Sequence, residues 1–204
     1  MSNVKLSILI PAYNPGKWLK GILDVLKPQI ECYPFTEVVI VDDGSTEDLM
    51  WATKYPFVKL WRQKNSGEPT ARNTLLYLSE GEYIQFVDAD DEIYPNTLDV
   101  VCDNISQGYD FVSYDFDTDH NRKRSYHNYG QLMVNCAMWG YTFRKSIFKG
   151  QLFNEKLLTG CDTDILQRVL REDMKHKHDD RVFYNYRWDG NVNSLCHKKL
   201  RGEI

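Results

Sequence analysis

Four short apolar runs constrain the fold of this chain more than any other feature. They occupy residues 5–11, 37–41, 58–61 and 83–87 and are rich in β-branched side chains. Continuous apolar runs of this length, bounded by turn-forming or acidic residues, are typical of strands buried on both faces of a parallel sheet. The first half of the chain therefore predicts such a sheet.

Helical spacing appears between these runs. Between the first two, apolar residues recur at Leu19, Ile22, Leu23 and Leu26, which places them on one face of a helix. We predict further helices at residues 70–79, 96–105 and 162–170. Because parallel neighbours need a crossover connection, alternating strands and helices predict an α/β fold with a mostly parallel, doubly wound sheet flanked by helices.

The length and composition indicate one domain. With 204 residues, of which 42% are hydrophobic, the chain can bury one substantial core but hardly two, so we expect a single domain over residues 1–204. The first apolar run stops at Pro11, and none reaches about 18 residues, so we expect no signal peptide and no integral membrane segment. The five cysteines are scattered and never form a C-x-x-C pair, which favours a cytoplasmic protein without a zinc site.

The net charge of -4 hides an asymmetry between the two halves. Residues 1–120 carry 9 Lys and Arg against 20 Asp and Glu, whereas residues 121–204 carry 16 against 9. The acidic half suits a metal-binding site for the donor of a group-transfer reaction. The basic half suits an anionic acceptor of that reaction or the phosphates of the donor. Scattered solvated charge is the simpler interpretation of the same numbers.

Polar residues follow three of the predicted strands directly. In open parallel sheets ligands bind outside the carboxyl ends of the strands, so chemistry is expected at these positions. The exits are Ala12-Tyr13-Asn14, Asp42-Asp43-Gly44-Ser45 and Asp88-Ala89-Asp90-Asp91.

The third exit predicts a metal site. Residues two apart point to the same side of an extended strand, which brings Asp88 and Asp90 together. Like charges held this close repel unless a cation neutralises them, and carboxylate oxygens select Mg²⁺ or Mn²⁺. Such a metal would bridge a diphosphate and stabilise a leaving group. A solvated acidic turn is the alternative.

The other exits offer groups for binding a nucleotide. Asp43, followed by a turn-forming Gly44, can accept hydrogen bonds from a base or a ribose, and Tyr13 can stack on a base. Arg72, near the start of a predicted helix, can pair with phosphate. The alternatives are a helix cap by Asp43 or Ser45, packing of Tyr13, and a surface ion pair of Arg72.

The second half is less regular. Residues 115–129 are polar and rich in charge, which predicts a surface loop. An apolar stretch follows at residues 138–143, and the aromatic run at residues 182–188 predicts a strand.

Four ordered motifs carry a resemblance to a known family. They are SILIPAYN at residues 7–14, VIVDDGST at 39–46, ARN at 71–73 and GEYIQFVDADD at 81–91. Together they resemble the family 2 glycosyltransferases with the GT-A fold, densely over the first half of the chain.

The resemblance implies an inverting transferase that uses a nucleotide sugar, with UDP favoured as the nucleotide. Residues 1–114 would bind this donor, through Pro11, Ala12, Tyr13, Asn14, Asp43, Arg72 and Asp88, and residues 115–204 would face the acceptor. Tyr13 and Asp43 would lie near the base and Asp88 near the ribose. Asp90, in the D-x-D motif, would bind Mn²⁺ or Mg²⁺.

The resemblance also implies a catalytic base. The family carries a Glu-Asp pair at the start of a helix, where this chain has Cys161 and Asp162. Asp162 therefore matches the base, and Asp164 is the alternate. Either would take a proton from the acceptor hydroxyl as it attacks the anomeric carbon from the face opposite the nucleotide. The structural alternative for Asp162 is a helix cap.

The closing segment matches the family loosely. The motifs Tyr186-Arg187-Trp188 and Asn193-Ser194-Leu195-Cys196-His197 resemble a region whose basic or His side chains reach the diphosphate. His197 would contact the metal or a phosphate, or would be a plain surface histidine.

The sequence allows more than one class of acceptor for the implied transfer reaction. The resemblance favours a surface polysaccharide or a lipid-linked saccharide, with at most peripheral contact with a membrane. The basic second half also fits a polyanionic acceptor such as nucleic acid. Two rival functions are a nucleotidyltransferase, which generally has a glycine-rich, basic loop where this chain has Pro11-Ala12-Tyr13-Asn14, and a non-catalytic binding module, which would not need Asp162.

Overall fold

A computed structural model describes residues 4–118, 122–123, 127–129, 132–134, 137–187 and 202 of the chain. Its main feature is a seven-stranded sheet in the order β12-β6-β11-β4-β1-β2-β3. The strands are β1 (Leu6–Ala12), β2 (Thr36–Asp42), β3 (Val58–Arg62), β4 (Tyr83–Phe86), β6 (Phe111–Tyr114), β11 (Tyr141–Arg144) and β12 (His176–Asp179). Only β11 runs antiparallel to its neighbours, β4 and β6. The mostly parallel α/β fold is therefore confirmed.

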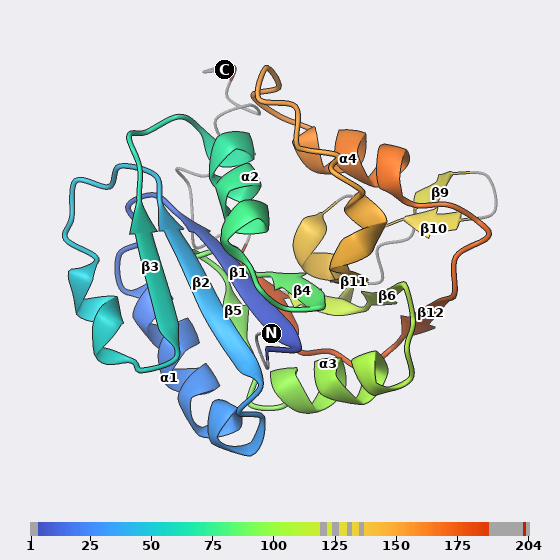
Figure 1. The fold of residues 1–204 in the computed structure, drawn as a ribbon, viewed down its shortest axis with the longest axis horizontal. Helices are drawn as coiled ribbons and strands as arrows, with labels where there is room; N and C mark the ends of the chain where they lie inside the picture. The colour runs from blue at the N-terminus through green and yellow to red at the C-terminus, as the bar shows by residue number, and fades with distance from the viewer. Residues whose placement is uncertain are drawn as a thin grey trace.

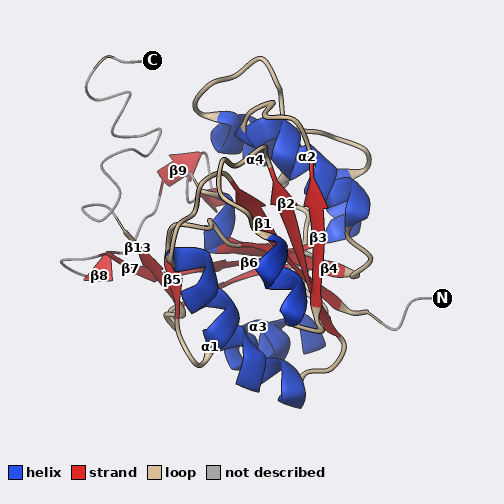
Figure 2. Ribbon diagram, turned by 90° about the vertical axis from the view of Figure 1, so that its left-hand side faces the viewer, coloured by secondary structure: helices blue, strands red, loops and turns tan. Residues whose placement is uncertain are grey.

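Helices cover both faces of this sheet (Figures 1 and 2). Helices α1 (Trp18–Cys32) and α3 (Thr97–Ser106) lie on one face, and α2 (Glu68–Leu78) and α4 (Cys161–Val169) on the other. Strand β1 shows why both layers form, because Ile8 and Ile10 pack into the α1 side while Leu9 packs into the α2 side. Successive side chains of a strand point to opposite faces, so an unbroken apolar run needs a cover on each.

A second, smaller sheet corrects the prediction for residues 115–129. That segment was expected to be a surface loop, but it contains β7 (Phe116–Thr118) and β8 (Arg122–Lys123), which pair in a four-stranded sheet of order β5-β13-β7-β8. The partners β5 (Glu92–Ile93) and β13 (Tyr184–Tyr186) come from distant parts of the chain. Strands β9 (His127–Tyr129) and β10 (Leu132–Val134) form a separate antiparallel pair. Short polar strands of this kind carry no periodic signal in the sequence, because pairing with other segments of the same chain specifies them.

The remaining elements agree with the sequence or refine it. All four predicted helices and the four predicted first-half strands are present, with ends shifted by a few residues. The apolar stretch at 138–143 becomes a 3-10 turn, η2 (Met138–Gly140), followed by β11. Two more 3-10 turns are η1 (Met50–Lys54) and η3 (Lys145–Phe148). In the part of the chain that the structure describes, no helix has the length and apolarity needed to cross a membrane.

Candidate active site

The carboxyl ends of β1 and β2 are tied together by their exit loops. The backbone N–H of Asn14 donates to Ser45 Oγ at 2.9 Å, and Asn14 Oδ1 accepts from the backbone N–H of Thr46 at 2.8 Å. Asn14 has a φ of +49°, a conformation that asparagine tolerates better than most residues. Tyr13 remains 55% exposed beside this link, with its ring open to a ligand. Pro11 and Ala12 are the last two residues of β1 itself.

Asp43 is bound to the loop that leads into α2. Its carboxylate accepts hydrogen bonds from the backbone N–H groups of Ser66 at 2.9 Å and Gly67 at 2.8 Å, and from Gln63 Nε2 at 2.8 Å. No helix begins at residues 43–49, so the capping alternative for Asp43 and Ser45 is wrong. Gly44 has a φ of +78°, and a Cβ there would lie 2.7 Å from the backbone nitrogen of Asn65. Only glycine fits this close approach of two loops.

Arg72 is the centre of the site. Its side chain is 1% exposed, and its guanidinium pairs with Glu68 at 2.5 Å, with Asp88 Oδ1 at 3.0 Å and with Asp162 Oδ1. These groups come from α2, from the turn after β4 and from the first turn of α4. The predicted donor residues Arg72 and Asp88 and the predicted base Asp162 thus converge, and the surface ion pair considered for Arg72 is wrong.

One guanidinium does not balance the acidic charge around it. Burial raises the pKa of Asp88 well above its ordinary range, although Arg72 opposes the shift. Burial likewise raises the pKa of Glu68, again against Arg72 and with repulsion from Asp162 and Asp90. Carboxylates that gain protons so readily are held where their charge is poorly compensated. Additional positive charge from a ligand or ion would lower the electrostatic cost of this arrangement.

The turn Asp88-Ala89-Asp90-Asp91 folds back on itself. The backbone N–H of Asp91 donates to the carbonyl of Asp88 at 3.2 Å, and the Asp91 carboxylate is buried. It accepts hydrogen bonds from the Tyr184 hydroxyl at 2.6 Å and from the backbone N–H of Arg187 at 2.9 Å. Burial and the neighbouring Asp90 raise the pKa of Asp91 to about 7. Asp90 is half-buried between these two acids, so the turn is folded and polar rather than freely solvated.

Asp162 and Asp164 lie in the first turn of α4 but have different partners. Asp162 Oδ2 accepts a hydrogen bond from the backbone N–H of Met138 at 3.0 Å, in addition to its contact with Arg72. Asp164 pairs with Arg168 on its own helix at 2.6 Å. Only Asp162 of the two contacts the Arg72 cluster. The side chain of Asp162 forms no capping bond within α4, so the cap alternative is wrong.

The sequence profile of the family described as Glycosyl transferase family 2 matches residues 7–184. The chain belongs to glycosyl transferase family 2. The fold and the family expected from the four motifs are both confirmed.

Curated proteins resemble the chain over different lengths. The Escherichia coli K12 glycosyltransferase YibD is 37% identical over 105 residues, which cover 49% of this chain and 30% of that protein. Chondroitin synthase of Escherichia coli is 28% identical over 217 residues, which cover 96% of this chain and 30% of the synthase. The chain thus spans less than a third of the length of these curated relatives.

Solved structures support the same fold. The crystal structure of residues 1–349 of TarS from Staphylococcus aureus superposes with a TM-score of 0.78 and 25% identity, over 90% of this chain and 60% of that one. A mannosyltransferase from Pyrobaculum calidifontis, solved with GDP-Man and Mn²⁺, superposes with a TM-score of 0.69 at 18% identity, over 89% of this chain and 56% of that one. The latter likeness concerns the fold alone.

Sequence reasoning missed two members of the site. Glu68 lies four residues before Arg72 on α2, and this helical spacing was a signal that it would pair with Arg72. Tyr184 belongs to the predicted aromatic strand, but its contact with Asp91, 93 positions away, had no signal in the sequence. His197, Trp188 and residues 193–197 lie outside the described residues.

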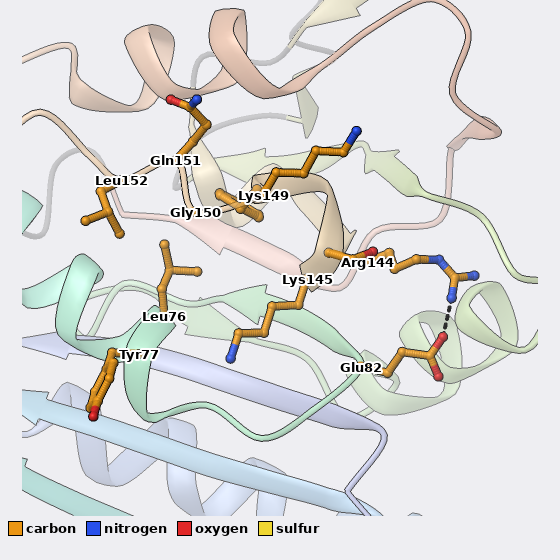
Figure 3. Close-up of a pocket in the computed structure, with 11 residues that line it drawn as sticks. Leu76, Tyr77, Glu82, Arg144, Lys145, Lys149, Gly150, Gln151 and Leu152 are labelled. Atoms are coloured by element: carbon orange, nitrogen blue, oxygen red, sulfur yellow. Dashed lines mark hydrogen bonds and ion pairs between the residues drawn. The ribbon is translucent and has the colours of Figure 1, made fainter.

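A cavity of about 600 Å³ lies away from these groups. It is lined by residues at the carboxyl end of α2, at the start of β4 and in η3, including Leu76, Tyr77 and Lys145 (Figure 3). Asp88 lies beyond the carboxyl end of β4, and Arg72 lies in the first half of α2. Arg144 on its rim pairs with Glu82, and the ammonium of Lys149 points away from that of Lys145 (Figure 3). The cavity is therefore separate from the candidate active site, and its basic groups do not converge on one ligand.

Proposed function

We propose that this chain is an inverting glycosyltransferase that transfers a sugar from a nucleotide diphosphate, with UDP as the favoured nucleotide, to an acceptor hydroxyl. The observation that carries the proposal is the meeting of Asp162, Asp88 and Arg72 at the carboxyl edge of the sheet, where ligands bind in open α/β folds. Membership of glycosyl transferase family 2 supplies the reaction class. A nucleotidyltransferase is the poorer interpretation on both grounds.

Asp162 is proposed as the general base. Its carboxylate is held by Arg72 on one oxygen and by the Met138 N–H on the other, which fixes its orientation. From there it accepts the proton of the acceptor hydroxyl while the hydroxyl oxygen bonds to the anomeric carbon. The bond to the nucleotide diphosphate breaks on the opposite face, so the configuration inverts.

Asp90 is proposed to hold a divalent metal ion, Mn²⁺ or Mg²⁺, and Asp88, two residues before it, is proposed to lie near the ribose of the donor. Among the described residues, no three His, Cys, Asp or Glu side chains form a ready-made metal site. The fit rests instead on chemistry, because carboxylate oxygens suit these ions and the raised pKa of Asp88 marks uncompensated negative charge. When bound, such an ion would stabilise the negative charge that develops on the departing diphosphate.

The donor's nucleotide is proposed to lie across the ends of β1 and β2. Tyr13 offers an exposed ring for stacking on a base. Asp43 already accepts three hydrogen bonds, but a carboxylate has about four acceptor positions, so it can still accept one from a base. Pro11, Ala12 and Asn14 would line the same strand end. The Staphylococcus aureus TarS structure solved with UDP-GlcNAc shares this fold, which supports the choice of donor class.

The acceptor is proposed to be a saccharide of a surface polysaccharide or a glycolipid, reached from the side of residues 115–204. Two relatives support a polymer acceptor, chondroitin synthase of Escherichia coli and the poly(ribitol-phosphate) β-N-acetylglucosaminyltransferase TarS of Staphylococcus aureus. TarS is 37% identical over 103 residues, covering 47% of this chain. The basic second half also suits an anionic polymer, and nucleic acid is the alternative that added salt and competing DNA would test.

The test is transfer from a panel of nucleotide sugars with Mn²⁺ or Mg²⁺ to oligosaccharide acceptors. We expect one donor to bind and to be consumed only when metal is present, and NMR of the product to show the inverted anomeric configuration. A product with retained configuration would overturn the inverting mechanism. Binding of a donor without transfer to any acceptor would favour the non-catalytic binding module.

A further inference from the structure

The hydroxyl of Tyr184 bridges the two ends of the turn that follows β4. It donates a hydrogen bond to Asp91 Oδ2 at 2.6 Å and accepts one from the backbone N–H of Asp88 at 3.1 Å. Asp88 and Asp91 are the first and last residues of that turn, and Asp90 lies between them. A single group that must donate and accept has to be a hydroxyl here, so phenylalanine could replace neither bond.

Tyr184 is itself held firmly. Its side chain is buried, and its ring stacks on Trp139 with centroids 4.6 Å apart and planes 5° from parallel. Strand β13 pairs Tyr184 with Ile93 in β5, the strand that begins directly after the turn. Burial raises the pKa of the Tyr184 hydroxyl well above its usual value, so the hydroxyl stays protonated and can always donate. The Tyr184 side chain therefore holds the turn in a fixed position.

The same packing leads to the proposed base. Trp139 lies in η2 beside Met138, whose backbone N–H donates to Asp162 Oδ2 at 3.0 Å. The turn is therefore connected to Asp162 in two ways, through the Arg72 guanidinium and through Tyr184, Trp139 and Met138. The second connection does not depend on ion pairs, so a bound cation or phosphate would not weaken it.

We propose that Tyr184 is a positioning residue for glycosyl transfer, whose hydroxyl fixes the Asp88–Asp91 turn so that Asp90 keeps its place relative to Asp162. The inference rests on the proposed function, because it assigns Tyr184 to the machinery of that reaction. Tyr184 touches neither donor nor acceptor in this role. It acts on the backbone of the turn and on Asp91.

The test compares Tyr184→Phe with a matched buried tyrosine. Tyr114 in β6 is also buried, and its hydroxyl forms a hydrogen bond with Thr142 Oγ1 at 3.0 Å. Its ring packs against Phe183, with the ring centroids 4.8 Å apart. Tyr184→Phe keeps the ring and its contact with Trp139 but loses both hydrogen bonds to the turn. We expect kcat at saturating donor and acceptor to fall about tenfold, as for groups that orient metal ligands. The Mn²⁺ concentration for half-maximal activity should rise, whereas KM for the acceptor should not change.

Tyr114→Phe should lower the melting temperature by a similar amount and leave kcat and the Mn²⁺ requirement at wild-type values. Equal kinetics in the two variants would overturn the positioning role, because the Tyr184 hydroxyl would then be structural only. Calorimetric titration of UDP with Mn²⁺ gives a readout that is independent of turnover. If the wild type binds without transferring, the proposed function fails while weaker binding by Tyr184→Phe than by Tyr114→Phe still supports the positioning role. A wild type that neither transfers nor binds overturns both.

Discussion

Two buried clusters of charge in this protein have opposite electrostatic balance. At the carboxyl edge of the sheet, the single cation Arg72 faces Glu68, Asp88 and Asp162. At the carboxyl end of the edge strand β12, the buried carboxylate of Asp179 is bound by the Arg181 guanidinium at 2.6 Å, by Lys177 at 3.3 Å and by Asn104 Nδ2 at 2.8 Å. Arg181 also pairs with the exposed Asp103 at 2.8 Å. The pKa of Asp88 lies above its ordinary range, and that of Asp179 lies below it.

This difference in charge balance means that the Asp179 cluster stabilises the fold, whereas the rest of the fold must hold the Arg72 cluster together. Around Asp179 each hydrogen bond favours the charged carboxylate, so burial is compensated locally. Around Arg72 burial outweighs the ion pairs, and the acids also repel one another. Acids with strongly shifted pKa values are common at functional sites, and these acids lie at the edge where open α/β folds bind their ligands.

Replacing Asp162 with Asn should have the largest effect. The amide keeps the shape of the side chain but cannot take a proton, so we expect kcat to fall about a thousandfold, within the range for loss of a general base. Donor binding measured by calorimetry should stay within a few-fold of wild type. The matched control is Asp164→Asn, two residues away and paired with Arg168. If Asp164→Asn abolished transfer and Asp162→Asn did not, Asp164 would be the base.

Removing the Asp90 carboxylate should weaken the donor complex in the presence of metal. With Asp90→Ala we expect the affinity for the nucleotide sugar in Mn²⁺ to fall about a hundredfold, because a ligand to the ion is lost. Without metal the two proteins should bind the donor equally weakly. Asp173, which is 77% exposed and pairs with Arg171, supplies the control Asp173→Ala. An Asp90→Ala variant with unchanged Mn²⁺ dependence would contradict the metal role.

Asp91→Asn should change how stability depends on pH. The pKa of Asp91 is raised to about 7 in the folded protein, so the folded state binds a proton that the unfolded chain releases near pH 4. The wild type therefore loses stability as pH rises from about 4 to about 7, and the variant lacks this loss. The free energy of unfolding of the variant relative to wild type should rise by at least about 1.4 kcal/mol between pH 4 and pH 8. Urea unfolding at both pH values measures it, and parallel curves would contradict the raised pKa.

Asp179→Asn should show the opposite sign and a smaller effect. Burial alone would raise the pKa of Asp179, but hydrogen bonds, chiefly from Arg181, outweigh burial and lower it in the folded protein. The contribution of Asp179 to stability is therefore present above about pH 4 and is lost as pH falls. We expect the variant to be about 1 kcal/mol less stable than wild type at pH 7, because Arg181 is 41% exposed and solvent screens the pair. The difference should shrink below pH 4. A variant whose deficit grew on acidification would contradict this assignment.

Local patterns explain why the first half was predictable. Its strands are continuous apolar runs and its helices have regular apolar spacing, and both signals lie within a few neighbouring residues. Strand β12, with the sequence HKHD, has no such signal, since it is a polar edge strand specified by pairing with β6. The same holds for β5, whose partner β13 lies far away along the chain. Strand β13 itself lies within the aromatic run at residues 182–188, which predicts a strand.

The sequence by itself determined the family, the order of the main elements and the types of residue at the strand ends, because these depend on short motifs and local periodicity. Only the tertiary structure decided that Arg72 would lie between Asp88 and Asp162, that Asp162 rather than Asp164 would join them, and that Tyr184 would bridge the turn. Arg72 and Asp162 are separated by 90 positions, and Tyr184 and Asp91 by 93. Contacts over such separations arise from the packing of α2, α4 and β13 around the sheet, and no local pattern encodes them.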